Sequence, residues 1–343
     1  MIKLLIGGSP CTYWSVAQTK NREVKAEGTG WELFRNFLIA KEKFKPDFFL
    51  YENNKSASQP IKEQISKELG VELMYINSAL VSAQNRERFY AFNWHIEQPQ
   101  DRHIILADIL EHGCPWNDKA YCLTASYAGA TLDNTIHRHQ RTMVAEPVKE
   151  NKIIRVGTFG SSSQTNRIHS IYGKSPCVCT GVGAYIAYSA ADGEAYPVYQ
   201  VKNGTIQVKD KICPIKLNDG FYIIRKLTPI ECERLQTLPD NYTAGISKTQ
   251  RYRCLGNGWT AEVIIHILSA LCERIPKKEK LLVLSMYDGI ATGRYCLDRL
   301  GFTNVEYHAY EIDKYAITVA TNRYPAIHQH GDAFQVRNEN WHL

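Results

Sequence analysis

The sequence lacks the signals of a disulfide-rich protein, a membrane protein or a protein with a targeting segment. Its ten cysteines are scattered and include no Cys-x-x-Cys pair, so no zinc site, disulfide framework or dithiol redox motif is indicated. No apolar run reaches the length that crosses a bilayer, and we expect no membrane association. No basic region followed by an apolar core and a cleavage site opens the chain. We therefore expect no targeting signal and a cytoplasmic location.

A strong charge of either sign is also missing. The net charge is +6 over 343 residues. Such a mild basic excess is compatible with a nucleic-acid partner but does not require one. The content of 44% hydrophobic and 22% charged residues is typical of a globular protein, and the length allows about two domains.

Buried-strand and helix patterns alternate at both ends of the chain. We expect strands at 2–6, 48–51, 71–76, 88–94, 281–284 and 305–310, and helices at 31–44, 59–69, 228–236, 260–274, 293–300 and 313–322. This alternation predicts an α/β fold with a mostly parallel sheet and helices on both faces. Between 95 and 224, short strand-like runs alternate with turn residues, which predicts an inserted, irregular β-rich domain. The expected division is 1–94, 95–224 and 225–343, with the first and last parts forming one domain.

Cys11 follows the first expected strand across a turn that contains Gly7, Gly8 and Pro10. Open α/β sheets bind ligands at this carboxyl end of their strands. The polar stretch 15–30 that comes next is long enough to be a mobile lid. The alternative is a structural cysteine in the core, because free cysteines are commonly buried.

Three charged side chains are expected at the same edge of the sheet. Glu52 directly follows the second strand, and Arg86 and Arg88 point the same way if their segment is extended. A thiol, a carboxylate and two guanidinium groups together suit covalent catalysis on an electron-poor ring. A structural Glu52–Arg88 ion pair is the alternative, and both interpretations can hold together.

A second glycine turn, at 288–293, follows the strand at 281–284, and Glu311 ends the next strand. An acidic residue at about this separation commonly binds ribose hydroxyls. The Gly-x-Gly-x-x-Gly pattern of pyrophosphate-binding sites is absent, because Gly289 and Gly293 are four residues apart. This favours a nucleoside cofactor without phosphates, such as S-adenosylmethionine, over an ordinary helix-capping turn.

In nearly every motif the chain resembles the DNA (cytosine-5) methyltransferases. Gly7 to Cys11 is similar to the catalytic Pro-Cys loop, Glu52 to Asn54 to the Glu-Asn-Val motif, and Gln84 to Arg88 to the Gln-x-Arg-x-Arg motif. Thr12 and Asn54 replace the usual Gln and Val, and neither change removes a catalytic group. The catalytic motifs are most similar to those of the animal de novo branch.

The remaining motifs occur in an unusual order. Arg225 to Pro239 resembles the motif that ends the recognition domain, and Leu255 to Trp259 resembles the last motif of the family. The segments that resemble the cofactor motifs, Asp288 to Gly293, Glu311 and Gly331-Asp332, come last here instead of first. The chain therefore looks circularly permuted, with the family's own ends at 275–280. We expect the two termini to lie close together on the surface.

The resemblance implies a Rossmann-like S-adenosylmethionine-dependent methyltransferase sheet with a target recognition domain at 95–224. It implies methyl transfer to C5 of a cytosine flipped out of duplex DNA. Cys11 would attack C6, Glu52 would protonate N3, Arg88 would hold O2, and Arg86 would support the Pro-Cys loop. The residues implied for the cofactor are Pro10, Asn257, Gly258, Trp259, Tyr287, Asp288, Gly289, Ile290, Ala291, Thr292, Gly293, Glu311, Ile312, Asp332 and Ala333. No metal is implied, and a monomer that acts on double-stranded DNA is expected.

Two alternative functions stay open. An RNA cytosine-5 methyltransferase of similar fold is disfavoured by the large inserted domain, because reading duplex DNA needs surface that enters its grooves. A catalytically inactive DNA-binding regulator is disfavoured by the intact Cys11, Glu52 and Arg88. Pairing with a restriction enzyme also stays open. Within the inserted domain, only Gly173 to Pro176 resembles a loop of the family.

Overall fold

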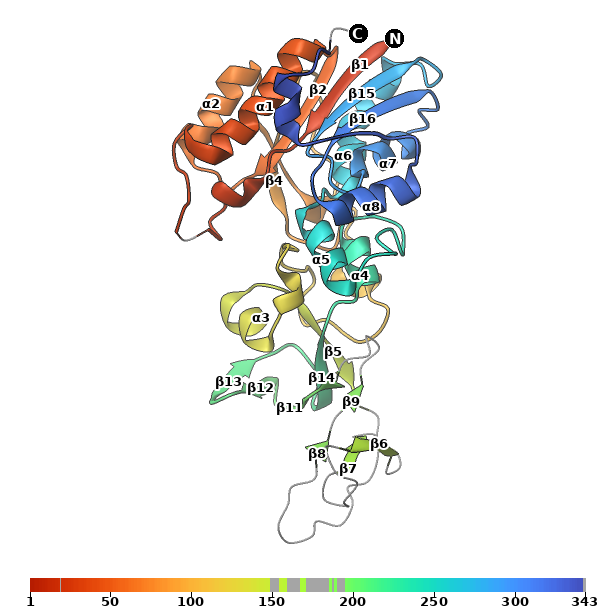
Figure 1. The fold of residues 1–343 in the computed structure, drawn as a ribbon. Coiled ribbons are helices and arrows are strands. Elements are labelled where there is room, and N and C mark those ends of the chain that lie inside the picture. Colours follow the sequence, from red (N-terminus) through yellow and green to blue (C-terminus); the bar gives the residue numbers. More distant parts are fainter. Residues whose placement is uncertain are drawn as a thin grey trace.

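The computed structural model describes residues 1–18, 20–148, 154–158, 167–170, 185–186, 188–189 and 195–341. The loop expected at Gly173 to Pro176 and the cysteines Cys177 and Cys179 lie outside the described residues. The fold consists of a large sheet covered by helices at one end and smaller sheets at the other (Figure 1).

The large sheet has seven strands in the order β17-β16-β15-β1-β2-β4-β3. The strands are β1 (Ile2–Gly7), β2 (Phe48–Asn54), β3 (Met74–Asn77), β4 (Glu87–Phe92), β15 (Leu281–Met286), β16 (Val305–Tyr310) and β17 (His328–Gly331). Every pairing is parallel except those of β4, which runs antiparallel to both β2 and β3. The prediction of a mostly parallel sheet is confirmed, and β1 lies at its centre beside β15.

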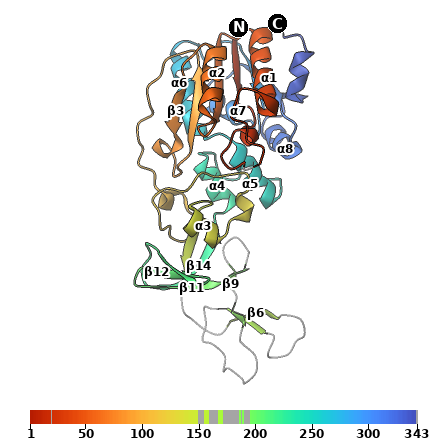
Figure 2. The ribbon, with the colours of Figure 1, turned by 90° about the vertical axis from the view of Figure 1, so that its left-hand side faces the viewer.

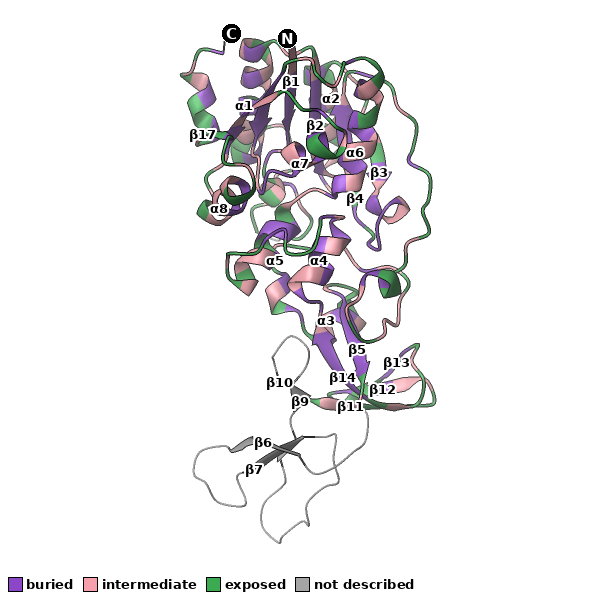
Figure 3. Cartoon of the chain, turned by 90° about the vertical axis from the view of Figure 1, so that its right-hand side faces the viewer, coloured by how far each residue is buried: buried purple, intermediate pink, exposed green. Residues whose placement is uncertain are grey.

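Helices cover both faces of this sheet, as predicted (Figures 1 and 2). Leu5 of β1 packs in the cluster that contains α1 (Gly28–Phe44) and α2 (Gln59–Leu69). Leu4 and Ile6 face the other way, in the cluster that contains α6 (Ala261–Ser269), α7 (Thr292–Arg299) and α8 (Lys314–Arg323). This division follows from the alternation of side chains along a strand. The buried strands lie between partly exposed helices in Figure 3.

Local sequence signals set several boundaries. Thr228 caps α4 (Pro229–Leu235) with the reciprocal Glu231 capping box that the sequence predicts. Gly70 ends α2 in the left-handed conformation, with φ of 70°. α5 (Lys248–Asn257) begins at the Ser247 cap and ends just before Gly258. The signals at Thr228 and Gly70 are local, so the sequence alone predicts them, whereas it does not predict α5.

The inserted region forms a five-stranded antiparallel sheet, in the order β13-β12-β11-β14-β5. Its elements are α3 (Leu132–Arg138), β5 (Met143–Pro147), β11 (Val198–Lys202), β12 (Thr205–Val208), β13 (Lys211–Pro214) and β14 (Gly220–Lys226). Short strands β6 (Ile154–Thr158), β7 (Arg167–Ser170), β8 (Tyr185–Ile186), β9 (Tyr188–Ser189) and β10 (Ala195–Tyr196) lie beyond it. Asn203 and Gly204 turn β11 into β12 with φ of 51° and 66°, the turn chemistry of a tight hairpin.

The helical stretch Lys248–Glu273 corrects the expectation that no apolar run is long enough to cross a bilayer. It is long and apolar enough to cross a membrane by length and composition alone, and 61% of its most apolar window is buried inside the protein. It comprises α5, α6 and the 3-10 turn Ala270–Glu273, with a break after α5. A core helix of a globular domain passes the same test, because burial selects the same apolar side chains.

The two ends of the chain lie side by side at one end of the large sheet (Figures 1 and 2). The N-terminal ammonium pairs with Glu279 at 2.6 Å. The Phe44 ring contacts both ends, because the Trp341 ring packs edge-on to it at 6.0 Å and the Lys3 ammonium lies 5.4 Å from its centre. This arrangement agrees with the expectation that the two termini lie close together.

Candidate active site

Cys11 begins the 3-10 turn Cys11–Tyr13 after β1, and the end of β2 holds the loop that leads to it. Asn53 donates a hydrogen bond to the Ser9 carbonyl at 2.9 Å, and the Ser9 and Tyr51 hydroxyls are bonded at 2.7 Å. A Cβ on Gly8 would lie 2.8 Å from the Glu52 carbonyl oxygen. Only glycine fits this approach, and the backbone before Cys11 therefore runs directly against β2.

Glu52 lies within β2 rather than after it, and its carboxylate has two partners. Trp259 donates Nε1–H to Oε2 at 2.9 Å, and Arg88 Nε lies 3.1 Å from Oε1. The Glu52 and Arg88 side chains are only 13% and 12% exposed. The expected ion pair is therefore real, and it lies beside Cys11 in a single cavity.

The Cys11 thiol is mostly buried, and burial raises its pKa. Arg88 is the largest opposing influence, Glu52 adds to the increase, and Arg86 opposes it. A raised pKa keeps the proton on sulfur near neutral pH. Cys11 must therefore lose a proton before it can act as a nucleophile.

Arg86 forms hydrogen bonds to three backbone carbonyls. Its guanidinium donates to the carbonyls of Leu123 and Gly258, each at 2.8 Å, and to that of Gly256 at 3.2 Å. These bonds hold the turn after α5, which carries Trp259, rather than the Pro-Cys loop. The observed bonds of Arg86 therefore support the partner of Glu52, and its support of the Pro-Cys loop stays a prediction.

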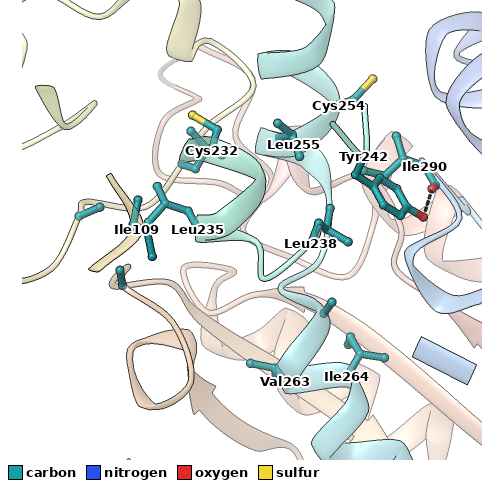
Figure 4. Packing of buried hydrophobic residues seen from close by; sticks show 14 of the residues in the cluster. Ile109, Cys232, Leu235, Leu238, Tyr242, Cys254, Leu255, Val263, Ile264 and Ile290 are labelled. Atoms are coloured by element: carbon teal, nitrogen blue, oxygen red, sulfur yellow. Dashed lines mark hydrogen bonds between the residues drawn. The ribbon is translucent and has the colours of Figure 1, made fainter. Parts of the chain in front are cut away.

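The turn between β15 and α7 forms the other half of the site. Tyr287, Gly289 and Ala291 have φ of 61°, 64° and 59°, so the backbone is left-handed at alternate positions. Glu311, at the end of β16, accepts from the Gly289 N–H at 2.8 Å. Tyr242 holds the same turn by donating to the Ile290 carbonyl at 3.0 Å (Figure 4).

Asp288 in this turn is a buried carboxylate with one free oxygen. Ser285 and Tyr307 donate to Oδ1 at 2.7 and 2.6 Å. Oδ2 is buried without a hydrogen-bond partner among the residues that the structure describes. Burial raises the pKa of Asp288 to about 6. An unpartnered buried oxygen is costly and fits a site that a ligand's donor completes.

A cavity of about 400 Å³ joins the two halves. The expected residues that line it are Pro10, Cys11, Glu52, Arg86, Arg88, Asn257, Gly258, Trp259, Tyr287, Asp288, Gly289, Ile290, Thr292, Glu311, Ile312, Asp332 and Ala333. Ala291 and Gly293 do not line it. Ala291 precedes α7, and Gly293 packs where a Cβ would overlap Ile6. Both residues shape the backbone of the turn, and their contact with the cofactor stays a prediction.

The sequence missed other parts of the site. Leu33, Arg253 and Phe334 also line the cavity, although Leu33 was interpreted only as a core residue of its helix. The segment 120–125, expected in the inserted domain, packs at the site, and a Cβ on Gly256 would overlap the Thr124 carbonyl. The spacing of residues does not predict such a contact, because the contact joins segments far apart in the sequence.

Several known proteins resemble this chain in sequence. The sequence model of the C-5 cytosine-specific DNA methylase family matches residues 1–273. The orphan methyltransferase M.SPRI of Bacillus phage SPR is 23% identical, over 80% of this chain and 84% of that protein. The type II methyltransferase M.Sau3AI of Staphylococcus aureus is 23% identical, over 77% and 76%. The crystal structure of S. pombe Dnmt2 methyltransferase covers 71% of this chain and 73% of that one, at 12% identity and a TM-score of 0.36.

The family match spans most of the chain and includes the Cys11, Glu52 and Arg88 motifs. Enzymes of this family methylate C5 of cytosine in DNA, with S-adenosylmethionine as the methyl donor. The chain belongs to the C-5 cytosine-specific DNA methylase family and is a DNA cytosine-5 methyltransferase.

Proposed function

We propose that this enzyme methylates a cytosine flipped out of duplex DNA, through a covalent bond between Cys11 and C6. The observation that carries the proposal is the position of Cys11, Glu52 and Arg88 in one cavity with residues 287–290 of the cofactor turn. Flipping costs a few kcal/mol, and it brings C6 within reach of a thiol that lies inside the protein.

Each step assigns a proton or a bond to a residue of this chain. The Cys11 thiol loses its proton, and its sulfur bonds to C6 while Glu52 donates a proton to N3. Arg88 holds O2, and Trp259 keeps the Glu52 carboxylate in place. S-adenosylmethionine supplies the methyl group when bound. Water then accepts the C5 proton, Glu52 takes back the N3 proton, and cleavage of the sulfur–C6 bond returns the Cys11 thiolate and releases 5-methylcytosine.

The residues present fit S-adenosylmethionine. The cavity volume of about 400 Å³ lies in the range of small-molecule sites. Oδ2 of Asp288 offers an acceptor without a partner in the described chain, and the Glu311 carboxylate lies at the end of β16. Ile312 is 73% exposed and lines the same cavity, so it offers an apolar surface for a purine ring.

We expect Glu311→Ala to weaken binding of S-adenosylmethionine by about 1–3 kcal/mol, because it leaves buried polar groups unpaired. Besides Gly289, the Ile312 and Asp313 N–H groups donate to this carboxylate. Isothermal titration calorimetry measures the change. Glu306→Ala on the same strand, whose carboxylate pairs with Lys280 outside the cavity, is the matched control. Equal dissociation constants for both variants and the wild type would contradict the assignment.

We expect the free energy of unfolding of the Asp288→Asn variant, relative to that of the wild type, to increase as pH rises. The native pKa of about 6 lies above the ordinary 3.8, so the wild type loses stability as pH rises between these values. The loss amounts to about 3 kcal/mol for such a shift. Urea unfolding without S-adenosylmethionine, at several pH values from about 4 to 7, measures the difference between the two proteins. Parallel pH dependences would show that Asp288 does not titrate as described.

We assign sequence recognition to residues 95–224 and catalysis to 1–94 with 225–343. The antiparallel sheet from β5 to β14 supports this division, although the segment 120–125 contacts the active site. Buried residues of β1 and of the recognition sheet, such as Leu4 and Val201, belong to the same core cluster. The two parts therefore share packing, so we expect the recognition sheet to be held firmly on the catalytic part.

Two observations support circular permutation. The first is the residue at which the family match ends, and the second is the position of three segments at the same end of the sheet. The match stops at residue 273, before the turn 275–280 and the cofactor strand β15. Ile2 at the start of β1 bonds to the Lys280 carbonyl at 2.9 Å. The N-terminus, this turn and Trp341 thus lie at the same end of the sheet.

A chain that joins Leu343 to Met1 by a short Gly/Ser linker and opens between Lys278 and Glu279 should fold and methylate the same sites. Exposed polar turns tolerate such cuts, and the packing is unchanged. Bisulfite sequencing compares the methylated sites of the two forms. A folded product that binds S-adenosylmethionine but leaves DNA unmethylated would contradict the permutation proposal.

The proposed function is tested by offering two nucleic acids to the enzyme. With tritiated S-adenosylmethionine, unmethylated plasmid DNA should accept label as 5-methyldeoxycytidine, and transfer RNA should accept none. Label in transfer RNA alone would favour the RNA methyltransferase, and label in neither would favour the inactive DNA-binding regulator.

A further inference from the structure

The segment 120–123 runs beside the arginine-bearing segment before β4. Asn85 donates to the Ala120 carbonyl at 2.8 Å, and Ala120 donates to the Ala83 carbonyl at 2.7 Å. The Leu123 N–H donates to Gln84 Oε1 at 3.2 Å. Residue 122 is therefore held against Arg86 and Arg88 by hydrogen bonds on both sides, backbone to backbone at Ala120 and to the Gln84 side chain at Leu123.

Cys122 occupies this position, and its sulfur contacts two guanidinium groups. Arg86 Nη1 lies 3.4 Å and Arg88 Nη2 lies 3.8 Å from Sγ. The Nε of Arg88 is bonded to Glu52. The Arg88 guanidinium thus lies between a carboxylate and a sulfur.

The Leu123 carbonyl also lies 3.6 Å from Sγ, and an ionised Cys122 would balance the charges of the two arginines and Glu52. Arg86 and Arg88 carry two positive charges, and Glu52 supplies one negative charge. Buried charges without a counter-ion are costly, so a second anion is favoured here. Burial by itself would raise the pKa of Cys122, but the two arginines outweigh it and lower the pKa.

We propose that Cys122 is a positioning residue for methyl transfer, whose thiolate holds Arg88 and Arg86 in place while Glu52 carries a proton. The proposal rests on the proposed function, in which Glu52 donates a proton to N3. Once Glu52 is neutral, it no longer fixes Arg88 by charge. The sulfur then remains as the anion that keeps Arg88 directed at O2.

This role predicts a change in the pH dependence of the reaction. Arg86 and Arg88 face Cys122, and Arg88, Glu52 and Arg86 act on Cys11. Tyr90 also lies near both arginines, but burial raises its pKa and keeps it neutral. Without the Cys122 charge, both arginines stabilise the Cys11 thiolate more strongly. The rising limb of the pH profile should therefore move to lower pH.

The test uses duplex DNA made by PCR with 5-fluorodeoxycytidine triphosphate, so the target sequence need not be known. With S-adenosylmethionine present, the rate of covalent trapping is measured from about pH 6 to about pH 9. Cys122→Ser keeps the size and removes the charge, and Cys122→Asp keeps a charge. Cys114→Ser is the control, because its half-buried sulfur bonds only the Ala145 carbonyl among the described residues.

Cys122→Ser should trap DNA on the order of tenfold more slowly at its optimum, with the rising limb at lower pH. Cys122→Asp should restore the wild-type position of the limb, and Cys114→Ser should match the wild type. Equal profiles for Cys122→Ser and the wild type overturn the proposal. Equal losses in the Ser and Asp variants without a pH shift indicate packing alone and also overturn it. Failure of the wild type to trap DNA contradicts the proposed function instead.

A second measurement covers the case in which the variants do not fold. Iodoacetamide labelling of the native wild type, followed by mass spectrometry, gives the pH dependence of alkylation at Cys122 and Cys114. Labelling of Cys122 should begin at lower pH, because only the thiolate reacts and burial raises the pKa of Cys114. Onset at the same or higher pH than for Cys114 overturns the proposal.

Discussion

Cys11→Ala is expected to abolish both methyl transfer and the covalent adduct with 5-fluorocytosine DNA. Fluorine at C5 cannot leave as a proton does, so the bond from sulfur to C6 persists in the wild type. Alanine offers no atom for this bond, and loss of a nucleophile lowers the rate by about 10⁴-fold or more. The adduct is measured as a band that survives a denaturing gel.

The alanine variant should still fold, because the change removes one sulfur atom from a side chain that is not fully buried. Binding of S-adenosylmethionine is therefore expected to be retained. Cys272→Ser, on the 3-10 turn Ala270–Glu273, is the matched control and should keep full activity. A Cys11→Ala protein that still methylates DNA would show that another group attacks C6.

Arg225→Met is expected to lower the free energy of unfolding by about 3–5 kcal/mol, because it leaves buried carboxylates without their cation. Arg225 is fully buried, and Nη1 and Nη2 each lie 2.8 Å from a Glu231 oxygen. Glu146 accepts from Nε, and the carbonyls of His112 and Lys226 accept from the remaining N–H groups. Urea unfolding measures the change.

Arg35→Met is the control for this prediction. Arg35 forms an ion pair with Glu32 at 2.8 Å, but its side chain is 54% exposed. Water screens such a pair, so the expected loss is below about 1 kcal/mol. Similar losses of unfolding free energy in the two variants would show that the buried network around Arg225 stabilises the fold no more than an exposed ion pair does. Because Arg225 joins β14 and β5 to α4, its loss should also uncouple the recognition sheet from the catalytic part.

The sequence predicted those features of the fold that depend on neighbours along the chain. The capping box of Thr228 and the end of α2 at Gly70 need only local geometry. The convergence of Cys11 and Glu52 followed from one rule, that parallel strands end at the same edge. The residues also indicate the arginines and the glycine turn, and the resemblance implies the roles of these groups.

The sequence could not predict contacts that depend on how distant segments meet. Nothing in the spacing of Cys122 places it against Arg86, because the backbone pairing of 120–123 with 83–85 creates this contact. The bonds of Arg86 to the turn after α5 depend on distant segments in the same way. The free oxygen of Asp288 depends on the hydroxyls of Ser285 and Tyr307, and the latter comes from another strand.

The central claim is that this chain methylates C5 of cytosine in duplex DNA by means of Cys11. Bisulfite sequencing of plasmid DNA from a host that lacks cytosine methylation, expressing either the wild type or Cys11→Ala, tests it most directly. The account predicts protected cytosines at a recurring sequence with the wild type and none with the variant. Full bisulfite conversion of every cytosine in plasmid DNA from cells that contain the folded wild-type protein would contradict it. Equal protection of cytosines by both proteins would also contradict it.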